Sequence, residues 1–373
     1  MICWLCALML INCKIPFDPS LKSSDTNTLV VEGYIDGATP VNFKLSRSRV
    51  LSVGDTAASR NELNALVTIE DDHQNTYPLT EAGNGTYIST DILNLDAAYQ
   101  YRLHIVTSTG REYLSDLVPF RQAPPIDTTG WKLKDGGLQV FVNTHDPNNT
   151  TKYYRWEYSE TWEFHSWYNS VSEYISATNS VVTRAVPVHI CWQSDHSTNI
   201  LLGSSAKLAN DVINEMPLTF IEPHDRKLSV LYSIWLKQYA LDINGYNYLT
   251  AMKNNTEQVG SIFDPQPNET VGNIHCVTDP SESVVGYISA GNSVEKRTFI
   301  SNSSLPPGWI PFQDCPQIFV PDIPDSLQYY FSGGYDPIAR SQSSAGQLGY
   351  SASYSGCVDC TLGGTNIKPA FWP

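Results

Sequence analysis

The feature that most constrains this chain is a series of short segments in which apolar and polar residues alternate. In residues 99–107, Tyr101, Leu103 and Ile105 alternate with Arg102 and His104, which is typical of a strand with one buried and one hydrated face. The chain also contains 21 Tyr, 9 Trp and 12 Phe, residue types that favour strands. These observations predict a mainly β fold.

Alternating segments between residues 28 and 122 follow one another at spacings typical of a β-sandwich. They cover residues 29–35, 41–45, 65–70, 86–89, 99–107 and 112–117. Turn sequences such as Asp36-Gly37 and Gly83-Asn84-Gly85 separate them. Leu95 followed by Tyr99 and Tyr101 resembles the approach to the sixth strand of immunoglobulin-like or fibronectin-like sandwiches. We therefore expect an N-terminal immunoglobulin/fibronectin-like β-sandwich over residues 28–122.

A second, larger β-rich domain is expected over residues 126–373, after the break at Ala123-Pro124-Pro125. Strands are predicted at residues 137–143, 152–159 and 228–240. Two short helices are predicted inside this domain. One contains Leu208, Val212 and Met216 at helical spacing, and Asp242 would cap the other, which runs through Met252. A chain of 373 residues is long enough for two domains.

The chain starts with an apolar leader that ends in Leu10, Ile11, Asn12 and Cys13. This ending resembles a bacterial lipobox, where cleavage precedes the cysteine and a diacylglycerol on its sulfur anchors the protein. It predicts a signal peptide over residues 1–12, lipidation of Cys13 and a tether over residues 13–27. The leader is too short for a transmembrane helix, which needs about 20 apolar residues. The alternative is a buried strand or an ordinary hydrophobic start.

The charge of the chain argues against one class of partner. It has 38 acidic and 23 basic residues, a formal net charge of −15. Such a surface repels phosphate backbones, and no basic run offsets it, so we expect no nucleic-acid binding. Attachment to the outer membrane would depend on the lipid rather than on the protein surface.

Four segments of the chain carry a family resemblance. They are Leu29-Val30-Val31-Glu32-Gly33; Ile190-Cys191-Trp192; Tyr232-Ser233-Ile234 with Gly260-Ser261-Ile262-Phe263-Asp264 and Gly272-Asn273-Ile274-His275-Cys276; and the tail from Cys357-Val358-Asp359-Cys360 to Phe371-Trp372. Together they resemble DUF4249, a domain of unknown function in Bacteroidota cell-envelope lipoproteins. Members are often encoded beside TonB-dependent outer-membrane transporters, which implies an accessory role. The resemblance implies no enzymatic activity.

Five cysteines follow the predicted anchor: Cys191, Cys276, Cys315, Cys357 and Cys360. An exported protein favours disulfides over zinc, so we expect two disulfides and one free thiol. We expect Cys191 to pair with Cys276, because each lies beside a predicted strand and in a segment that carries the resemblance. Cys315 would pair with Cys357 or Cys360 and tie the C-terminal tail to the body. A redox bridge or a zinc site at Cys357 and Cys360 is the alternative.

An aromatic run from Tyr153 to Tyr168 is the local feature that most suggests recognition. On the predicted strand, Tyr154, Trp156 and Tyr158 share one face, and Tyr153, Arg155 and Glu157 share the other. The next aromatic residues, Trp162, Phe164, Trp167 and Tyr168, would form a loop that presents rings to a glycan, a peptide or a partner protein. The alternative is that these rings belong to the core.

No catalytic or metal-binding motif is found in the sequence. It lacks the Gly-x-Ser-x-Gly elbow and the glycine-rich phosphate loops. Pairs such as Asp71-Asp72 arise easily by chance in so acidic a chain. We therefore predict no enzyme, no cofactor and no metal, with calcium at acidic loops such as Asp322 and Asp325 left open.

These observations predict a lipid-anchored outer-membrane protein that acts as a non-catalytic accessory or ligand-binding subunit of a TonB-dependent transporter. The cell surface is only slightly favoured over the periplasmic face, because Asp18 is a lone acidic residue and four non-acidic residues separate it from Cys13. One alternative is a free-standing surface adhesin or envelope structural protein. A hydrolase with an unrecognised site is the other alternative.

Overall fold

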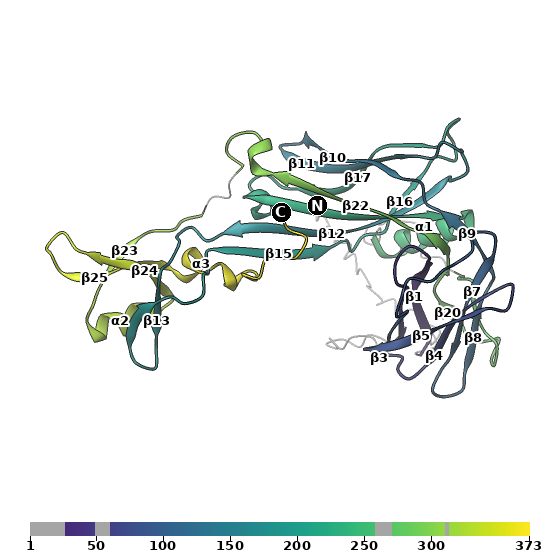
Figure 1. Ribbon diagram of the computed structural model, residues 1–373, viewed down its shortest axis with the longest axis horizontal. Coiled ribbons are helices and arrows are strands. Elements are labelled where there is room, and N and C mark those ends of the chain that lie inside the picture. Colours follow the sequence, from purple (N-terminus) through teal and green to yellow (C-terminus); the bar gives the residue numbers. More distant parts are fainter. Residues whose placement is uncertain (1–26, 49–59, 258–270, 310–312) are drawn as a thin grey trace, which may run out of the picture.

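The computed structural model describes residues 27–48, 60–257, 271–309 and 313–373. The predicted signal peptide, Cys13 and the tether up to residue 26 lie outside these residues. Figure 1 shows three parts: a barrel formed by the N-terminal strands, a central pair of sheets, and a lobe that projects from the far end of those sheets. The fold is mainly β, as predicted. No helix of the described segments is long and apolar enough to cross a membrane.

The barrel is an eight-stranded ring in the order β7-β4-β5-β6-β2-β1-β21-β9, and β9 pairs back onto β7. Its strands are β1 (Leu29–Asp36), β2 (Asn42–Arg47), β4 (Leu66–Asp71), β5 (Thr76–Gly83), β6 (Thr86–Ile88), β7 (Gln100–Val106), β9 (Val118–Gln122) and β21 (Ala290–Asn292). Four further strands lie beside the ring, namely β3 (Arg60–Asn61), β8 (Glu112–Ser115), β19 (Ile274–Cys276) and β20 (Val284–Val285). The six strands predicted for this region are confirmed, whereas β5 and β9 were not predicted.

The predicted immunoglobulin/fibronectin-like sandwich is not found; the N-terminal strands belong to this closed ring instead. β21 pairs in parallel with β1 on one side and with β9 on the other, so it closes a single mixed sheet. A sandwich would instead keep two separate antiparallel sheets. The strand that closes the ring, β21, belongs to residues 126–373, for which a separate second domain was expected.

The core of the barrel consists of the inward-facing residues of each strand. In β1, Leu29, Val31 and Ile35 are buried, and Gly33 lies between them. A Cβ on Gly33 would lie 2.2 Å from Cδ1 of Phe43, and its φ of +157° is one that side-chain-bearing residues rarely adopt. A glycine is therefore required where Phe43 packs against this strand.

The central part consists of two sheets packed face to face. One has the order β15-β12-β18-β22, with β16 also paired to β12, and the other has the order β10-β11-β17. Their strands are β10 (Ile126–Lys134), β11 (Gly137–His145), β12 (Tyr153–His165), β15 (Ile190–His196), β16 (Leu201–Ser204), β17 (Val212–Ile221), β18 (Leu231–Leu241) and β22 (Val294–Ser301). Tyr232, Ile234 and Leu236 of β18 pack with Val140 and Val142 of β11 in one core. The residues of β18 that alternate with these three therefore lie on the opposite face of the sheet.

One of the two predicted helices is confirmed. Helix α1 (Ile243–Glu257) follows Asp242, whose Oδ1 accepts a hydrogen bond of 2.7 Å from the backbone N–H of Gly245. The helix predicted around Leu208 is wrong, because β17 starts at Val212 and pairs with β11. Leu208 and Val212, which suggested an apolar helix face, are 55% and 44% exposed. Pairing with a distant strand therefore overrides the local spacing.

The projecting lobe has a small core of its own (Figure 1). It contains β23 (Ile318–Pro321), β24 (Tyr335–Gln342), β25 (Leu348–Tyr354) and helix α2 (Pro324–Phe331), with the hairpin β13 (Ser172–Ile175) and β14 (Ser180–Thr183) beside them. Short helical turns complete the chain: η1 (Arg226–Leu228), η2 (Asn302–Ser304), α3 (Ser355–Val358) and η3 (Cys360–Leu362). Val320, Leu327 and Tyr350 form the centre of the lobe core.

Candidate functional site

A cleft of about 840 Å³ lies between the barrel and the central sheet. Strands β1 and β2 form one wall, and the outer faces of β12 and β18 form the other. Helix α1, residues 197–200, residues 285–287 and Glu295 also line it. Binding sites occur preferentially at such junctions between packed units, so this cleft is the candidate site.

A buried ion pair joins the two walls of the cleft. Lys237 Nζ lies 2.9 Å from Oδ2 of Asp36 and donates to Thr39 Oγ1 at 2.7 Å. Asp36 also accepts hydrogen bonds from the backbone N–H and the hydroxyl of Ser293. Burial alone would raise the pKa of Asp36, but the hydrogen bonds from Ser293 and Lys237 outweigh it and hold this pKa below its usual value. The carboxylate is therefore charged at neutral pH.

A second polar group lies on the sheet side of the cleft. Arg155 pairs with Oε1 of Glu157, and the hydroxyl of Tyr239 donates to Oε2 of Glu157 at 2.8 Å. Burial, and then the charge of Glu157, raises the pKa of Tyr239, so its hydroxyl stays protonated. The ring of Tyr239 packs 4.7 Å from the ring of Tyr34 in β1. This network fixes the orientation of the Glu157 carboxylate.

Trp235 adds an aromatic surface beside these charges. It lies on the same face of β18 as Lys237 and is half-buried. Its neighbours across the sheet are Ser159 in β12 and Arg297 in β22.

Two of the four residues predicted to present rings to a ligand lie in the core. Trp162 and Phe164 are 5% and 3% exposed. Lys227 Nζ lies 5.0 Å from the Trp162 ring centroid, and Arg226 Cζ lies 4.1 Å from that of Phe164. Cations therefore cover these rings where they approach the surface.

The other two residues of that prediction have different surroundings. The hydroxyl of Tyr168 donates to the carbonyl of Cys315 at 2.8 Å, and its N–H donates to the carbonyl of Cys357 at 3.0 Å. Tyr168 therefore holds the C-terminal segment in place. Trp167 is 54% exposed. The structure does not bring the four rings together as one surface.

One sequence signal pointed to the cleft. The alternation in residues 152–159 places Arg155 and Glu157 together on the face of the strand opposite the core residues, and both residues line the cleft. The same alternation in β18 places Trp235, Lys237 and Tyr239 on one face. The pairing of β12 with β18, which puts Glu157 opposite Lys237, could not be read from either segment alone.

The structure contains two disulfides, Cys191–Cys360 and Cys315–Cys357. The second agrees with the prediction, and the expected pair of Cys191 with Cys276 is wrong. Cys191 belongs to the core of the central sheets, whereas Cys276 lies in β19 and belongs to the core of the barrel. Among the five described cysteines, Cys276 is the free one. The alternative redox bridge between Cys357 and Cys360 is also excluded.

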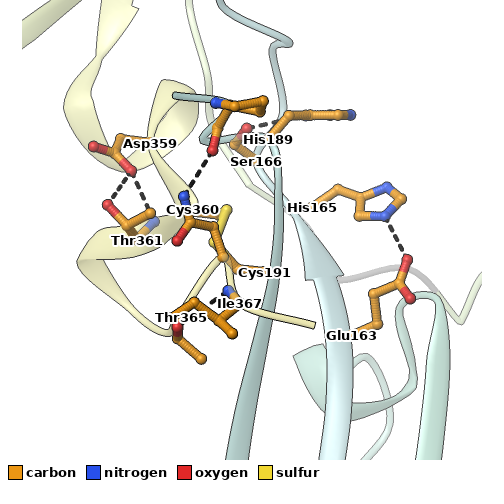
Figure 2. Close-up of a disulfide and its surroundings, with 12 residues drawn as sticks. Glu163, His165, Ser166, His189, Cys191, Asp359, Cys360, Thr361, Thr365 and Ile367 are labelled. Carbon is orange, nitrogen blue, oxygen red and sulfur yellow. Dashed lines mark hydrogen bonds and ion pairs between the residues drawn. A yellow bond between two sulfur atoms is a disulfide. The ribbon is translucent and has the colours of Figure 1, made fainter. Parts of the chain in front are cut away.

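Figure 2 shows how the Cys191–Cys360 disulfide holds the tail against the edge of the central sheet. Beyond Cys360, Thr365 forms a β-bridge with Trp192 in β15. Further along, Trp372 Nε1 donates to Oε2 of Glu163 at 2.9 Å. The tail therefore covers part of the same sheet face that lines the cleft.

A serine and a histidine lie together beside this disulfide (Figure 2). Ser166 Oγ is 3.1 Å from His189 Nδ1, and it donates to the carbonyl of Tyr168 at 2.9 Å. Burial, and then the nearby ring of His165, lowers the pKa of His189. Because the hydroxyl proton is used in the bond to Tyr168 and Ser166 is buried, the pair stabilises the turn and is unsuited to nucleophilic attack.

The acidic loops singled out in the sequence are engaged in local contacts. Asp71 accepts hydrogen bonds from the N–H groups of His73 and Asn75, which form a turn. Asp322 lies 3.7 Å from Arg340, and Asp325 lies in the first turn of α2. Oxygen atoms of Asp71 and Asp72 and a ring nitrogen of His73 also lie within 4.8 Å of one another, so this turn could hold a metal ion.

Comparison with known protein families gives a match. A family model described as a domain of unknown function, DUF4249, matches residues 14–297. No curated protein matches the chain. The matched residues include both walls of the cleft, from β1 through Glu295.

Proposed function

The chain belongs to the DUF4249 family, and on that premise we propose that it is an outer-membrane lipoprotein that serves as a non-catalytic, ligand-binding subunit of a TonB-dependent transporter. The observation that carries the binding role is the cleft between β1 and β18. Four of its charged side chains form two pairs, Asp36–Lys237 and Arg155–Glu157. Such pairs hold their side chains in fixed orientations toward a ligand.

The membrane part of the proposal depends on the lipobox-like sequence at Cys13. A lipid on Cys13 would be connected to β1 by the tether of residues 13–27, which reaches up to about 45 Å when extended. The barrel would then be the part nearest the membrane. The transporter part depends on the family resemblance, because members are often encoded beside such transporters.

Affinity purification of the full-length protein from its own outer membrane, in mild detergent, tests the proposal. We expect a lipid-modified N-terminal peptide that starts at Cys13, and a β-barrel transporter that co-elutes in stoichiometric amounts. A Cys13→Ser variant is the matched control, because it keeps the cleft and loses the anchor. Recovery of the acylated protein alone would favour a free-standing adhesin, and an unmodified N-terminus would contradict the membrane assignment.

A further inference from the structure

We propose that the cleft binds a neutral oligosaccharide, with the Trp235 ring as the surface on which a sugar stacks; this rests on the ligand-binding role proposed above. The inference depends on the charge, the hydrogen-bonding groups and the shape of the cleft.

The two central ion pairs of the cleft favour a neutral ligand beside them. Lys237 is 15% exposed and pairs with Asp36, which is 4% exposed. Arg155, 27% exposed, pairs with Glu157. A charged ligand bound at these two pairs would have to separate one of them and leave a partly buried charge without its partner, which is costly. A neutral ligand leaves both pairs intact.

The same groups are well suited to sugar hydroxyls. The side chains of Glu157 and Glu295 are 42% and 32% exposed, and they lie on either side of Lys237 across the sheet. An ionised carboxylate can accept about four hydrogen bonds. Glu157 uses two acceptor positions, for Arg155 and Tyr239, and so has others available for hydroxyl donors.

Trp235 supplies the apolar contact that a sugar ring also needs. One face of a pyranose consists of C–H groups, which pack favourably on an indole. Trp235 lies directly opposite Arg297 in β22, and the pair Lys237–Glu295 is two positions further along the same sheet face. A sugar stacked there would place its hydroxyls within reach of the neighbouring carboxylates.

The strands of the cleft argue against a peptide held by its backbone. β12 and β18 each have a paired strand on both sides, and β1 and β2 belong to the closed ring. Their backbone groups are therefore already bonded, and a peptide could not add to them as a further strand. Recognition must come from side chains, as it does for sugars.

Calorimetric titration of the purified protein tests the proposal. The probes are maltohexaose, cellohexaose, xylohexaose and laminarihexaose, with pentalysine and a neutral Gly-Ser hexapeptide for comparison. We expect one-to-one binding of at least one hexasaccharide and neither peptide. Trp235→Ala should weaken that binding by about tenfold, and Trp235→Phe by less.

Trp167→Ala is the matched control, because Trp167 is exposed but does not line the cleft. The Trp167→Ala variant should bind the hexasaccharide with the same affinity as the unaltered protein. Thermal melts would establish that the Trp167→Ala and Trp235→Ala variants are folded. Absence of binding by every hexasaccharide, equal affinity after Trp235→Ala, or preference for a peptide would each overturn the proposal. Sugar binding by a protein that co-purifies with no transporter would instead contradict the transporter role alone.

Discussion

Lys237 Nζ lies 2.9 Å from Oδ2 of Asp36, and this ion pair joins β18 of the central sheet to β1 of the barrel. The two residues are 201 positions apart in the sequence, counting from 36 to 237. Ser293, which comes just after the strand that closes the barrel, donates two further hydrogen bonds to the same carboxylate. One carboxylate therefore connects the barrel, its closing segment and the sheet that forms the other wall of the cleft.

Removal of that carboxylate should destabilise the protein strongly. We expect Asp36→Ala to lower the free energy of unfolding by about 3–5 kcal/mol, because it leaves Lys237 without its buried partner. Glu295→Ala is the control. The Glu295 carboxylate lies 3.7 Å from the same lysine and is 32% exposed, so its removal should lower the free energy of unfolding by only about 0–1 kcal/mol. Urea unfolding measures both. Equal effects of the two substitutions would contradict this role of Asp36.

The same carboxylate should make stability depend on acid pH. Burial opposes ionisation of Asp36, yet the hydrogen bonds from Ser293 and Lys237 keep its pKa below the usual value. Its stabilisation is therefore fully present above the unfolded-state pKa of about 3.9 and is lost as the pH falls through the lower folded-state pKa. Unfolding followed from pH 7 down to about pH 2 should show a smaller loss of stability for Asp36→Asn than for the unaltered protein. Parallel curves would argue against this linkage.

The disulfide pairing can be checked by peptide mapping and by stability. Mass spectrometry under non-reducing conditions should find Cys191 linked to Cys360, and Cys315 linked to Cys357. Because Cys191 and Cys360 are 169 residues apart, their replacement by serine should lower the free energy of unfolding by about 3–5 kcal/mol.

Cys276→Ser is the control for this change, and it should leave both linked peptides unaltered. Alkylation of Cys276 should require unfolding, because its thiol is buried. A peptide that links Cys191 to Cys276 would contradict the structure.

The two tryptophans of the aromatic run should behave differently. Trp162→Ala should cost about 3–5 kcal/mol of stability, because it removes a large side chain from the core. Trp167→Ala should change stability by no more than about 0.5 kcal/mol, since its ring is exposed. Thermal and urea unfolding of the two variants measure this difference, and a destabilisation of similar size at both positions would refute it.

The sequence by itself determined the local elements. Alternation identified the six N-terminal strands, because a strand with one buried face must alternate its side chains. Asp242 marked the start of α1 because its carboxylate can accept the free N–H groups of the first turn. The same local reasoning failed at Leu208 and Val212, where the pairing of β17 with β11 decided the conformation.

Only the tertiary structure decided which distant segments meet. The closure of the barrel depends on the pairing of Ile35 with Ala290, and the cleft depends on the approach of Asp36 to Lys237. The partner of Cys191 likewise depends on the path of the tail along β15. Local periodicity shows which face of a strand or helix is buried, but it does not show which other element packs against that face. The partner is selected by packing over the whole chain, because each long-range contact must offset the entropy of closing its loop.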